Sequence, residues 1–404
     1  MKVAVIGGGA AGFFAAINVK ENFPDASVSI YEKSNKLLSK VKISGGGRCN
    51  VTNAETSIKL LSDAYPRGGM QLKKAFREFS TQHTMDWFEA RGVPLQIQED
   101  DCVFPVSQDS QSVIDCFLNE CKKFRIIILK GHAVTLIERT KDRLTLRFKD
   151  SNLKSKNFDK VIVATGGSPK RSGLEWLENM DHLIEDPVPS LFTFNMPRDP
   201  IKDLMGVVVD DPLVTIQNTK LKADGPLLIT HWGMSGPAIL KLSALGARIL
   251  SDRNYHFHVN VNWVHQKNNE LIYQDLSAIC KSHPQKKLTS IRPYDLPDRL
   301  WKFLIIKANL VFDKKWGELG KKGLNKLVNI MAHDNYEVSG KTTFKQEFVT
   351  CGGVSLDSID FETMKSNVIP NLYFAGEVLD VDGITGGYNF QSCWTTGYIA
   401  GRLG

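Results

Sequence analysis

The apolar positions near the start of the chain predict a strand, a helix and a second strand. Val3 to Ile6 is a short, mostly β-branched run, as expected for a strand buried on both faces. The Ala- and Phe-rich segment from Phe13 to Lys20 indicates a helix, and Ser27 to Tyr31 indicates the second strand. This order is typical of a βαβ unit with parallel strands.

Similar patterns return near the end of the chain. Buried strands are predicted at Val161 to Ala164 and at Leu372 to Ala375, and a Gly-rich turn at 383–387 precedes a final helix. Between the first two strands and the third, the pattern predicts amphipathic helices over 70–91 and 110–123 and a hairpin over 92–107. The two ends of the chain are therefore expected to build one α/β domain.

The middle of the chain has a different character. From about Pro187, β-branched alternation with Pro, Gly and Asp breaks predicts a small antiparallel unit, and residues 266–335 show mostly helical patterns. We expect a discontinuous nucleotide-binding domain over 1–187 and 350–404. Two inserted parts are expected, a β-rich module over 188–265 and a basic helical module over 266–349.

Three glycines after the first strand carry the clearest chemical signal. Gly7, Gly9 and Gly12 have G-x-G-x-x-G spacing between a strand and a helix, and Glu32 follows the second strand. Such glycines allow a tight turn, close approach of a pyrophosphate, and close packing of helix on strand. The helix N-terminus attracts phosphate, and the carboxylate can accept ribose hydroxyls. The spacing alone also occurs for packing, but the strand, helix and acid together predict dinucleotide binding.

Further glycines lie where other ligand contacts are expected. Thr165 to Gly167 follow the strand at 161–164, and ligands bind at the carboxyl ends of parallel strands. The run Gly45 to Gly47 leads to Arg48, which could cap a phosphate or make a surface ion pair. Lys33 and Lys40 are near enough in sequence to line the same cleft, and an adenine could stack near His132 to Val134, although an ordinary strand explains that segment equally well.

Composition limits the class of protein. Among 404 residues, 42% are hydrophobic and 24% charged, and no apolar run reaches membrane-spanning length, so a globular protein without a membrane span is expected. The βα unit begins at residue 2, so we expect no signal peptide and a cytoplasmic location. Seven scattered cysteines, without C-x-x-C pairs or zinc-ligand spacing, indicate reduced thiols and no metal site.

The positive charge is concentrated in one stretch. Between Arg248 and Glu347 there are seventeen Lys or Arg and ten Asp or Glu, a difference of seven that equals the net charge of +7. A solvated helical surface accounts for this excess, and attraction of an acidic substrate or of nucleic acid is the alternative. No RNA- or DNA-binding motif accompanies the charge, which disfavours a nucleic-acid partner.

Six motifs together carry a family resemblance: VAVIGGGAAG, ISGGGRCNVTN, VIVATGGSP, LLITHWGMSGPAI, CGGVSLDSID and YFAGEVLDVDGITGGYNFQ. The chain resembles FAD-binding flavoproteins related to aminoacetone oxidase and to a bile-acid-pathway flavin reductase, within the glutathione-reductase-like group. The resemblance implies a Rossmann-like α/β domain holding noncovalent FAD, with the inserted modules over the flavin. The candidate cofactor-binding residues are Gly7, Gly9, Ala10, Ala11, Gly12, Glu32, Lys33, Lys40, Gly47, Arg48, Cys49, Val134, Thr165, Gly166, Gly376, Glu377, Gly387, Asn389, Phe390 and Gln391.

The expected function is FAD-dependent oxidation or reduction of a small organic substrate, such as an amine, amino ketone or enone. NAD(P)H is a candidate electron donor, but a second G-x-G-x-x-G is missing, so it would dock in the insert or over the flavin ring. The alternatives are a nucleic-acid-associated flavoprotein that uses the basic helical module, and a structural FAD without turnover. Disulfide reduction is disfavoured, because Cys49 has no second Cys nearby.

The final helix suggests how the protein would tune a flavin. Its N-terminus, from Tyr388 to Gln391, is hypothesised to face the flavin's N1/C2=O edge and to stabilise the negative charge of the reduced form. Replacement of Asn389 or Gln391 should then shift the flavin potential. The sequence assigns no catalytic acid or base, with His231 a weak candidate on a predicted loop, and does not indicate an oligomeric state.

Overall fold

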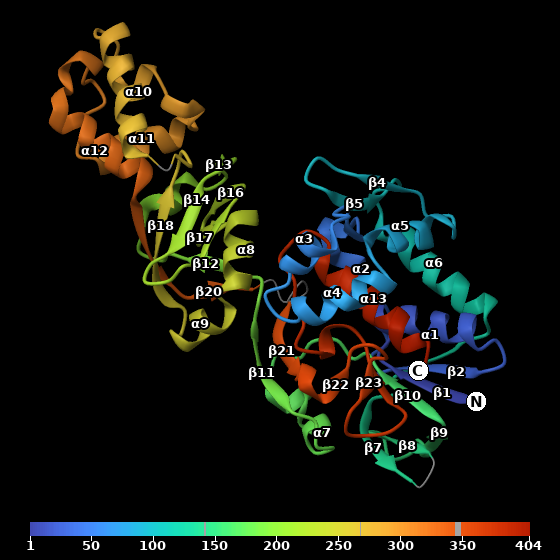
Figure 1. Ribbon diagram of the computed structural model, residues 1–404. Coiled ribbons are helices and arrows are strands. Elements are labelled where there is room, and N and C mark those ends of the chain that lie inside the picture. The colour runs from blue at the N-terminus through green and yellow to red at the C-terminus, as the bar shows by residue number, and fades with distance from the viewer. Residues whose placement is uncertain (141–142, 267, 344–348) are drawn as a thin grey trace. The chain divides into compact units, whose positions relative to one another are not determined.

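The computed structural model describes residues 1–140, 143–266, 268–343 and 349–404. The chain forms two compact units: unit 1 comprises Met1–Ser190 and Phe344–Gly404, and unit 2 comprises Leu191–Thr343. Both ends of the chain therefore belong to unit 1 (Figure 1). The expected domain boundaries, including the division of the insert near residue 265, remain predictions.

Unit 1 is built on a seven-stranded sheet in the order β22-β23-β24-β10-β1-β2-β6. Strands β24, β10, β1, β2 and β6 run parallel, and the short β22 and β23 pair antiparallel at one edge. The apolar runs of β1 and β10 are almost completely buried, as parallel strands covered on both faces require. The bounds are β1 (Lys2–Ile6), β2 (Ser27–Glu32), β6 (Ile127–Lys130), β10 (Lys160–Val163), β22 (Ile359–Asp360), β23 (Lys365–Ser366) and β24 (Leu372–Phe374).

Two helices from opposite ends of the chain pack against each other beside this sheet. They are α1 (Ala10–Asn22) and α13 (Tyr388–Gly401), and Figure 1 shows them side by side. A Cβ at Gly397 would lie 3.1 Å from the Ala11 carbonyl oxygen, and one at Gly401 would lie 2.6 Å from Asn18 Cβ. Glycines in α13 therefore allow the close helix contact that joins the two ends of the chain.

Smaller elements surround this core. Three small sheets have the orders β3-β5-β4, β7-β8-β9 and β11-β21. Their strands are β3 (Thr52–Asn53), β4 (Leu95–Ile97), β5 (Cys102–Pro105), β7 (Val134–Arg139), β8 (Leu144–Phe148), β9 (Lys156–Phe158), β11 (Ile184–Pro189) and β21 (Thr350–Val354). The remaining helices of unit 1 are α2 (Ser39–Ile43), α3 (Ile58–Asp63), α4 (Gly69–Glu78), α5 (Thr81–Glu89), α6 (Ser110–Lys123) and α7 (Glu175–Glu178), with 3-10 helices η1 (Ser44–Gly47), η2 (Arg171–Gly173), η7 (Leu356–Ser358) and η8 (Gly376–Val378).

Unit 2 combines two antiparallel sheets with helices around its own hydrophobic core. The sheet orders are β13-β16-β17-β12-β20 and β15-β14-β18-β19. The strands are β12 (Thr193–Asn195), β13 (Val208–Val209), β14 (Leu213–Ile216), β15 (Lys222–Asp224), β16 (Leu227–Thr230), β17 (Gly233–Ser235), β18 (His256–Asn262), β19 (Asp334–Ser339) and β20 (Lys341–Thr342). The expected helical module over 266–349 thus also contains two strands, β19 and β20. Asp334–Ser339 alternates between buried and exposed positions, as a strand with one buried face does.

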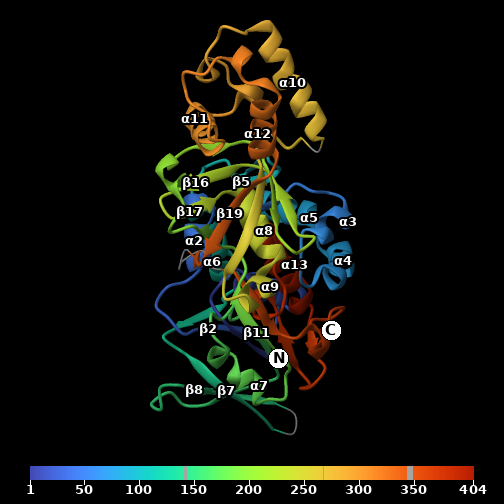
Figure 2. The ribbon, with the colours of Figure 1, turned by 90° about the vertical axis from the view of Figure 1, so that its left-hand side faces the viewer.

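Three helices of unit 2, α10, α11 and α12, gather at one end of its four-stranded sheet (Figures 1 and 2). The bounds are α8 (Pro237–Leu245), α9 (Ala247–Asp252), α10 (Asn269–Ser282), α11 (Asp298–Lys307) and α12 (Gly320–Ala332), with 3-10 helices η3 (Pro200–Leu204), η4 (Leu288–Ser290), η5 (Pro293–Asp295) and η6 (Trp316–Glu318). Leu300 and Trp301 of α11 and Leu327 of α12 are fully buried in the same core as the strands.

The structure confirms the predicted Rossmann-like α/β fold. The βαβ unit, the helices over 70–91 and 110–123, and the hairpin of β4 and β5 all form where the pattern predicted them. Within the described part of the chain, no helix combines the length and the apolar character needed to cross a bilayer.

Candidate dinucleotide site

The turn between β1 and α1 shows a separate task for each of its three motif glycines. Gly7 has φ +117°, and a Cβ there would lie 2.2 Å from the Ala164 carbonyl oxygen. A Cβ at Gly12 would lie 2.0 Å from the Gly7 carbonyl oxygen, whereas a Cβ at Gly9 would meet nothing within 4 Å. Packing therefore requires glycine at the first and third positions. The second position faces open space, where a phosphate group can approach the backbone.

Glu32 is held beside this turn by the backbone. Its Oε2 accepts a hydrogen bond from the Gly8 N–H at 2.8 Å, and its Oε1 accepts one from the Ser34 N–H at 2.8 Å. Each carboxylate oxygen keeps a second acceptor site, which ribose hydroxyls could use. The His132 N–H donates to the Glu32 backbone carbonyl oxygen at 2.9 Å. This bond holds the segment before β7 beside Glu32, and β7 begins two residues later at the half-buried Val134.

We expect Glu32→Ala to weaken FAD binding by roughly 1.5–3 kcal/mol, a factor of about 10 to 150, because hydrogen bonds to a charged acceptor have this magnitude. Titration of the apoprotein with FAD, followed by the quenching of flavin fluorescence, measures the change. Glu32→Gln keeps the shape and one acceptor oxygen, and it should lose less affinity. Equal affinities in all three proteins would contradict a ribose contact at Glu32.

The glycine-rich loop after α2 also leaves bare backbone open to a ligand. Gly46 and Gly47 have φ +68° and +88°, and a Cβ at either position would meet nothing within 4 Å. Arg48 already has partners: its Nε donates to the Gly45 carbonyl oxygen at 3.1 Å, and its guanidinium lies 4.1 Å from the Phe104 ring centroid. Gly166, after β10, has φ +72° and open space at its Cβ position, and Thr165 is exposed.

Cys49 is completely buried and adopts φ +64°. Burial raises the pKa of its thiol to about 12, so the reactive thiolate is absent near neutral pH. We expect the flavin of the Cys49→Ser variant to be reduced at the same rate as the flavin of the parent protein. Alkylation of the folded protein with iodoacetamide, read by mass spectrometry, should leave Cys49 unmodified. Rapid alkylation, or loss of flavin reduction in the variant, would restore a redox role for this thiol.

The segment after β24 packs against the start of α1. A Cβ at Gly376 would lie 2.6 Å from Ala11 Cβ. The next residue, Glu377, forms an ion pair with Lys40 at 2.5 Å and accepts a hydrogen bond from the Thr350 N–H at 2.9 Å. Lys33 is exposed. The structure therefore brings Lys40 and Glu377 together, although 337 positions separate them in the sequence.

The N-terminus of α13 is fixed from several sides. Its N-cap Gly387 has φ +90°. The Gly387 N–H donates to Asn50 Oδ1 at 3.1 Å when the Asn50 amide nitrogen is oriented to donate to the carbonyl oxygens of Thr52 and Val103. The Tyr65 hydroxyl donates to the Tyr388 carbonyl oxygen at 2.6 Å. The loop at 45–50 and the turn at 383–387 are thereby joined. Asn50 and Tyr65 were not among the predicted site residues, and only the position of Asn50 beside the Gly45 to Gly47 run was a signal.

Two predicted site residues on α13 use their side chains within the protein. Asn389 accepts from the Gly383 N–H at 2.9 Å and donates to the Gly383 carbonyl oxygen at 2.9 Å. Gln391 is completely buried, and its Oε1 accepts from Thr52 at 2.6 Å and from Thr84 at 2.8 Å. Phe390 stacks on Trp394 with ring centroids 5.5 Å apart. Contact with a cofactor at Asn389 would therefore involve the backbone, whereas the Gln391 N–H already donates to the Gly387 carbonyl oxygen at 3.1 Å. Both side chains would position the helix.

The comparisons with known proteins identify the family and the fold of this chain. A profile described as "HI0933-like protein Rossmann domain" matches residues 1–403. The chain belongs to the HI0933-like protein family. Two curated relatives match this chain over nearly its whole length. A 3-dehydro-bile acid delta(4,6)-reductase from Clostridium scindens is 26% identical over 99% of this chain and 98% of its own. A ribosomal RNA dihydrouridine synthase from Haemophilus influenzae is 28% identical over 98% of this chain and 96% of its own.

Solved structures show the same fold at low sequence identity. A 3-ketosteroid-delta4-(5alpha)-dehydrogenase from Rhodococcus jostii is similar with a TM-score of 0.51 and 11% identity, over 99% of this chain and 96% of that one. A 3-ketosteroid delta1-dehydrogenase from Sterolibacterium denitrificans gives a TM-score of 0.52 and 10% identity, over 99% and 98%. This HI0933-like protein is an FAD-dependent oxidoreductase. The bare glycine backbones and the Glu32 carboxylate fit the adenosine diphosphate half of FAD.

Proposed function

We propose that this HI0933-like protein reduces a carbon–carbon double bond that is conjugated to a carbonyl group. The names of both curated relatives support the proposal, because a bile-acid delta(4,6)-reductase and a dihydrouridine synthase each add two hydrogens across such a bond. The two relatives differ in substrate size, but each matches this chain over almost its entire length. The common chemistry is therefore a better guide than either substrate.

The reaction balances with one hydride and one proton. In this site, bound and reduced FAD would supply the hydride that the β-carbon of the substrate takes up. The α-carbon would take a proton from solvent water. We propose NAD(P)H as the hydride donor that would restore the reduced cofactor. The chain's own contribution is to bind and orient: Gly9 leaves room for phosphate, Glu32 accepts ribose hydroxyls, and the first turn of α13 presents backbone N–H groups.

The first turn of α13 carries the electrostatic part of the proposal. Among the described residues, the N–H groups of Tyr388, Asn389 and Phe390 have no hydrogen-bond acceptor. These donors and the positive end of the helix dipole would stabilise the negative charge of a reduced flavin. Asn389 and Gln391 hold this turn in place through their own side-chain bonds. Substitution at either position would then lower the reduction potential by moving the donors.

Anaerobic reoxidation of the flavin tests the proposal. The purified yellow protein is reduced with dithionite, and separately with NADH and with NADPH, while the flavin absorbance is followed. A 3-keto steroid with a conjugated double bond, uridine and uridine-containing RNA are then added in turn. At least one should restore the oxidised absorbance without oxygen and yield a product heavier by two hydrogens. Bleaching of oxidised flavin by amines, with reoxidation by oxygen only, would instead indicate an oxidase.

A further inference from the structure

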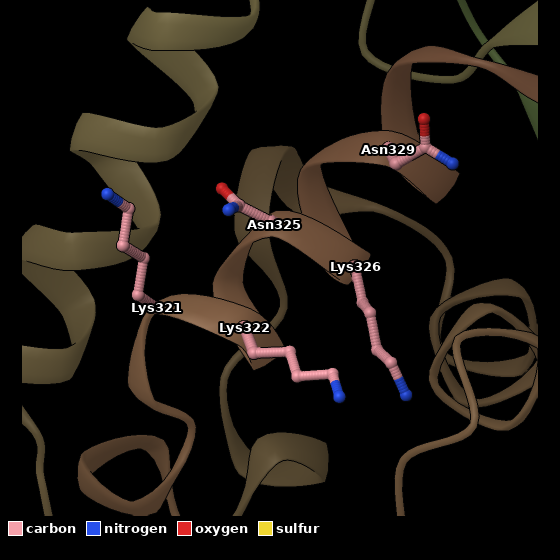
Figure 3. Close-up of a pocket in the computed structure, with 5 residues that line it drawn as sticks. All are labelled: Lys321, Lys322, Asn325, Lys326 and Asn329. Carbon is pink, nitrogen blue, oxygen red and sulfur yellow. The ribbon is translucent and has the colours of Figure 1, made fainter.

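One face of α12, in unit 2, lines a surface hollow of about 560 Å³. Its lining consists only of cationic and amide side chains, which come from five positions of this one helix: Lys321, Lys322, Asn325, Lys326 and Asn329. Figure 3 shows the Lys322 and Lys326 side chains extending from the same side of the helix. Four of the five residues are exposed, and Lys326 is half-buried. The face is therefore available to a ligand from solution.

The helix positions explain why these residues share a face. The lining residues follow an i, i+1, i+4, i+5, i+8 spacing, which keeps them on one side of a helix with 3.6 residues per turn. The opposite side carries Leu324, Leu327, Val328 and Met331, which are buried in the core of unit 2. Over these eight steps the polar face is roughly 12 Å long, at about 1.5 Å per residue.

Among the residues that the structure describes, the lysines of this face do not make the ion pairs that three other lysines of unit 2 make. Lys287, Lys302 and Lys307 form ion pairs with Asp313, Asp298 and Asp334 at 2.5, 2.7 and 2.5 Å. By contrast, none of the three α12 lysines has a carboxylate within 4.0 Å in the part of the chain that the structure describes. The helix itself contains no Asp or Glu.

Fold stability does not account for this arrangement. Two of the three lysines lie in the first turn of α12, where the helix dipole disfavours positive charge. Like charges at Lys322 and Lys326, one turn apart, repel each other by a few tenths of a kcal/mol. An anionic partner would remove both costs.

We propose that this lysine–asparagine face binds the phosphate backbone of RNA. The inference rests on the proposed reduction of a conjugated double bond, because the uracil ring of RNA is such a substrate. Lysines neutralise phosphates, and Asn amides donate to phosphate and sugar oxygens. The lining contains no apolar residue of the kind that inserts into a membrane surface. It also lacks the aromatic residues and Arg that are enriched in protein–protein interfaces, whereas Lys is depleted there.

Salt-dependent RNA binding by the full-length, FAD-loaded protein tests the inference. The probe is a fluorescently labelled, single-stranded, uridine-containing RNA, and anisotropy gives Kd over a series of KCl concentrations. In K321Q/K322Q/K326Q, the slope of log Kd against log[KCl] should fall by about 2, since each lysine–phosphate contact contributes roughly 0.7 on a single strand. At low salt the affinity should drop about tenfold or more.

The matched control removes the same charge elsewhere. K154Q/K220Q/K222Q replaces three exposed lysines outside α12 and should keep the parent slope and affinity. Equal slopes in the two triple variants, no RNA binding by the parent protein, or equal binding to phosphatidylserine vesicles would each overturn the inference. Reoxidation of the reduced flavin by a 3-keto steroid, measured in the same variants, should stay unchanged. That reaction reports on the proposed function separately, because it needs no RNA.

Discussion

Gly9→Glu is expected to yield a folded protein that retains almost no FAD. The backbone at Gly9 has φ −99° and ψ −171°, which any residue adopts, and its Cβ position is open, so the side chain can be accommodated. A carboxylate there would fill the space next to the N-terminus of α1, where we place the pyrophosphate, and its negative charge would repel the phosphates. We expect the affinity for FAD to fall at least about 100-fold, which corresponds to roughly 2.7 kcal/mol.

Three measurements separate loss of the cofactor from loss of the fold. The ratio of flavin to protein absorbance after gel filtration gives occupancy, far-UV circular dichroism gives helix content, and titration with FAD gives Kd. Gly9→Gln has nearly the same shape without the charge and should bind more tightly than Gly9→Glu. Gly9→Ala should bind most tightly of the three. A Gly9→Glu protein with full flavin occupancy would show that the dinucleotide lies elsewhere.

The local sequence was sufficient to predict much of the nucleotide-binding part of the fold. The apolar run of β1, the glycines after it and the acid at the end of β2 are close in sequence, so their spacing alone defines the βαβ unit. The same holds for α6, for the β4–β5 hairpin and for α13. These elements have a strong periodicity or a clear turn, and tertiary contacts did not have to select among alternatives.

Contacts between distant residues could not be predicted in this way. The buried amide of Gln391 bonds to Thr52 and Thr84, which lie more than 300 positions earlier. From sequence, the family resemblance placed Gln391 among the cofactor-contacting positions. In the structure the same residue satisfies buried hydroxyl groups, because unpaired polar groups in a core are costly. Motif position therefore predicted where the helix begins, but it did not predict the direction of this side chain.

The charge pattern of unit 2 could be predicted from the sequence only in part. The excess of positive charge between Arg248 and Glu347 was evident from composition. The distribution of this charge over the surface was not evident, because ion pairs such as that of Lys307 with Asp334 join residues on different elements. Only the folded chain shows which lysines are paired and which share one helix face.

Arg67→Ala is expected to destabilise unit 1 by about 3–5 kcal/mol, because it leaves a buried carboxylate without its positive partner. Asp382 is completely inaccessible to solvent, and Arg67 Nε donates to its Oδ1 at 2.6 Å. The Arg67 Nη2 group and the Ser190 hydroxyl both donate to the other oxygen of Asp382. This cluster precedes the turn at 383–387, so its loss should also loosen the N-terminus of α13 and weaken FAD binding.

Urea unfolding of the FAD-free protein, followed by circular dichroism, measures the stability change. Arg402→Ala is the matched control, since Arg402 and Glu78 form an exposed ion pair at 2.9 Å whose loss should cost at most about 1 kcal/mol. The double variant R67M/D382L replaces both charges with apolar side chains and should recover much of the lost stability. If Arg67→Ala were no more destabilising than Arg402→Ala, the buried carboxylate would not depend on Arg67. If R67M/D382L were as unstable as Arg67→Ala, the cost would arise from lost packing rather than from an uncompensated charge, because only the second cause is removed together with Asp382.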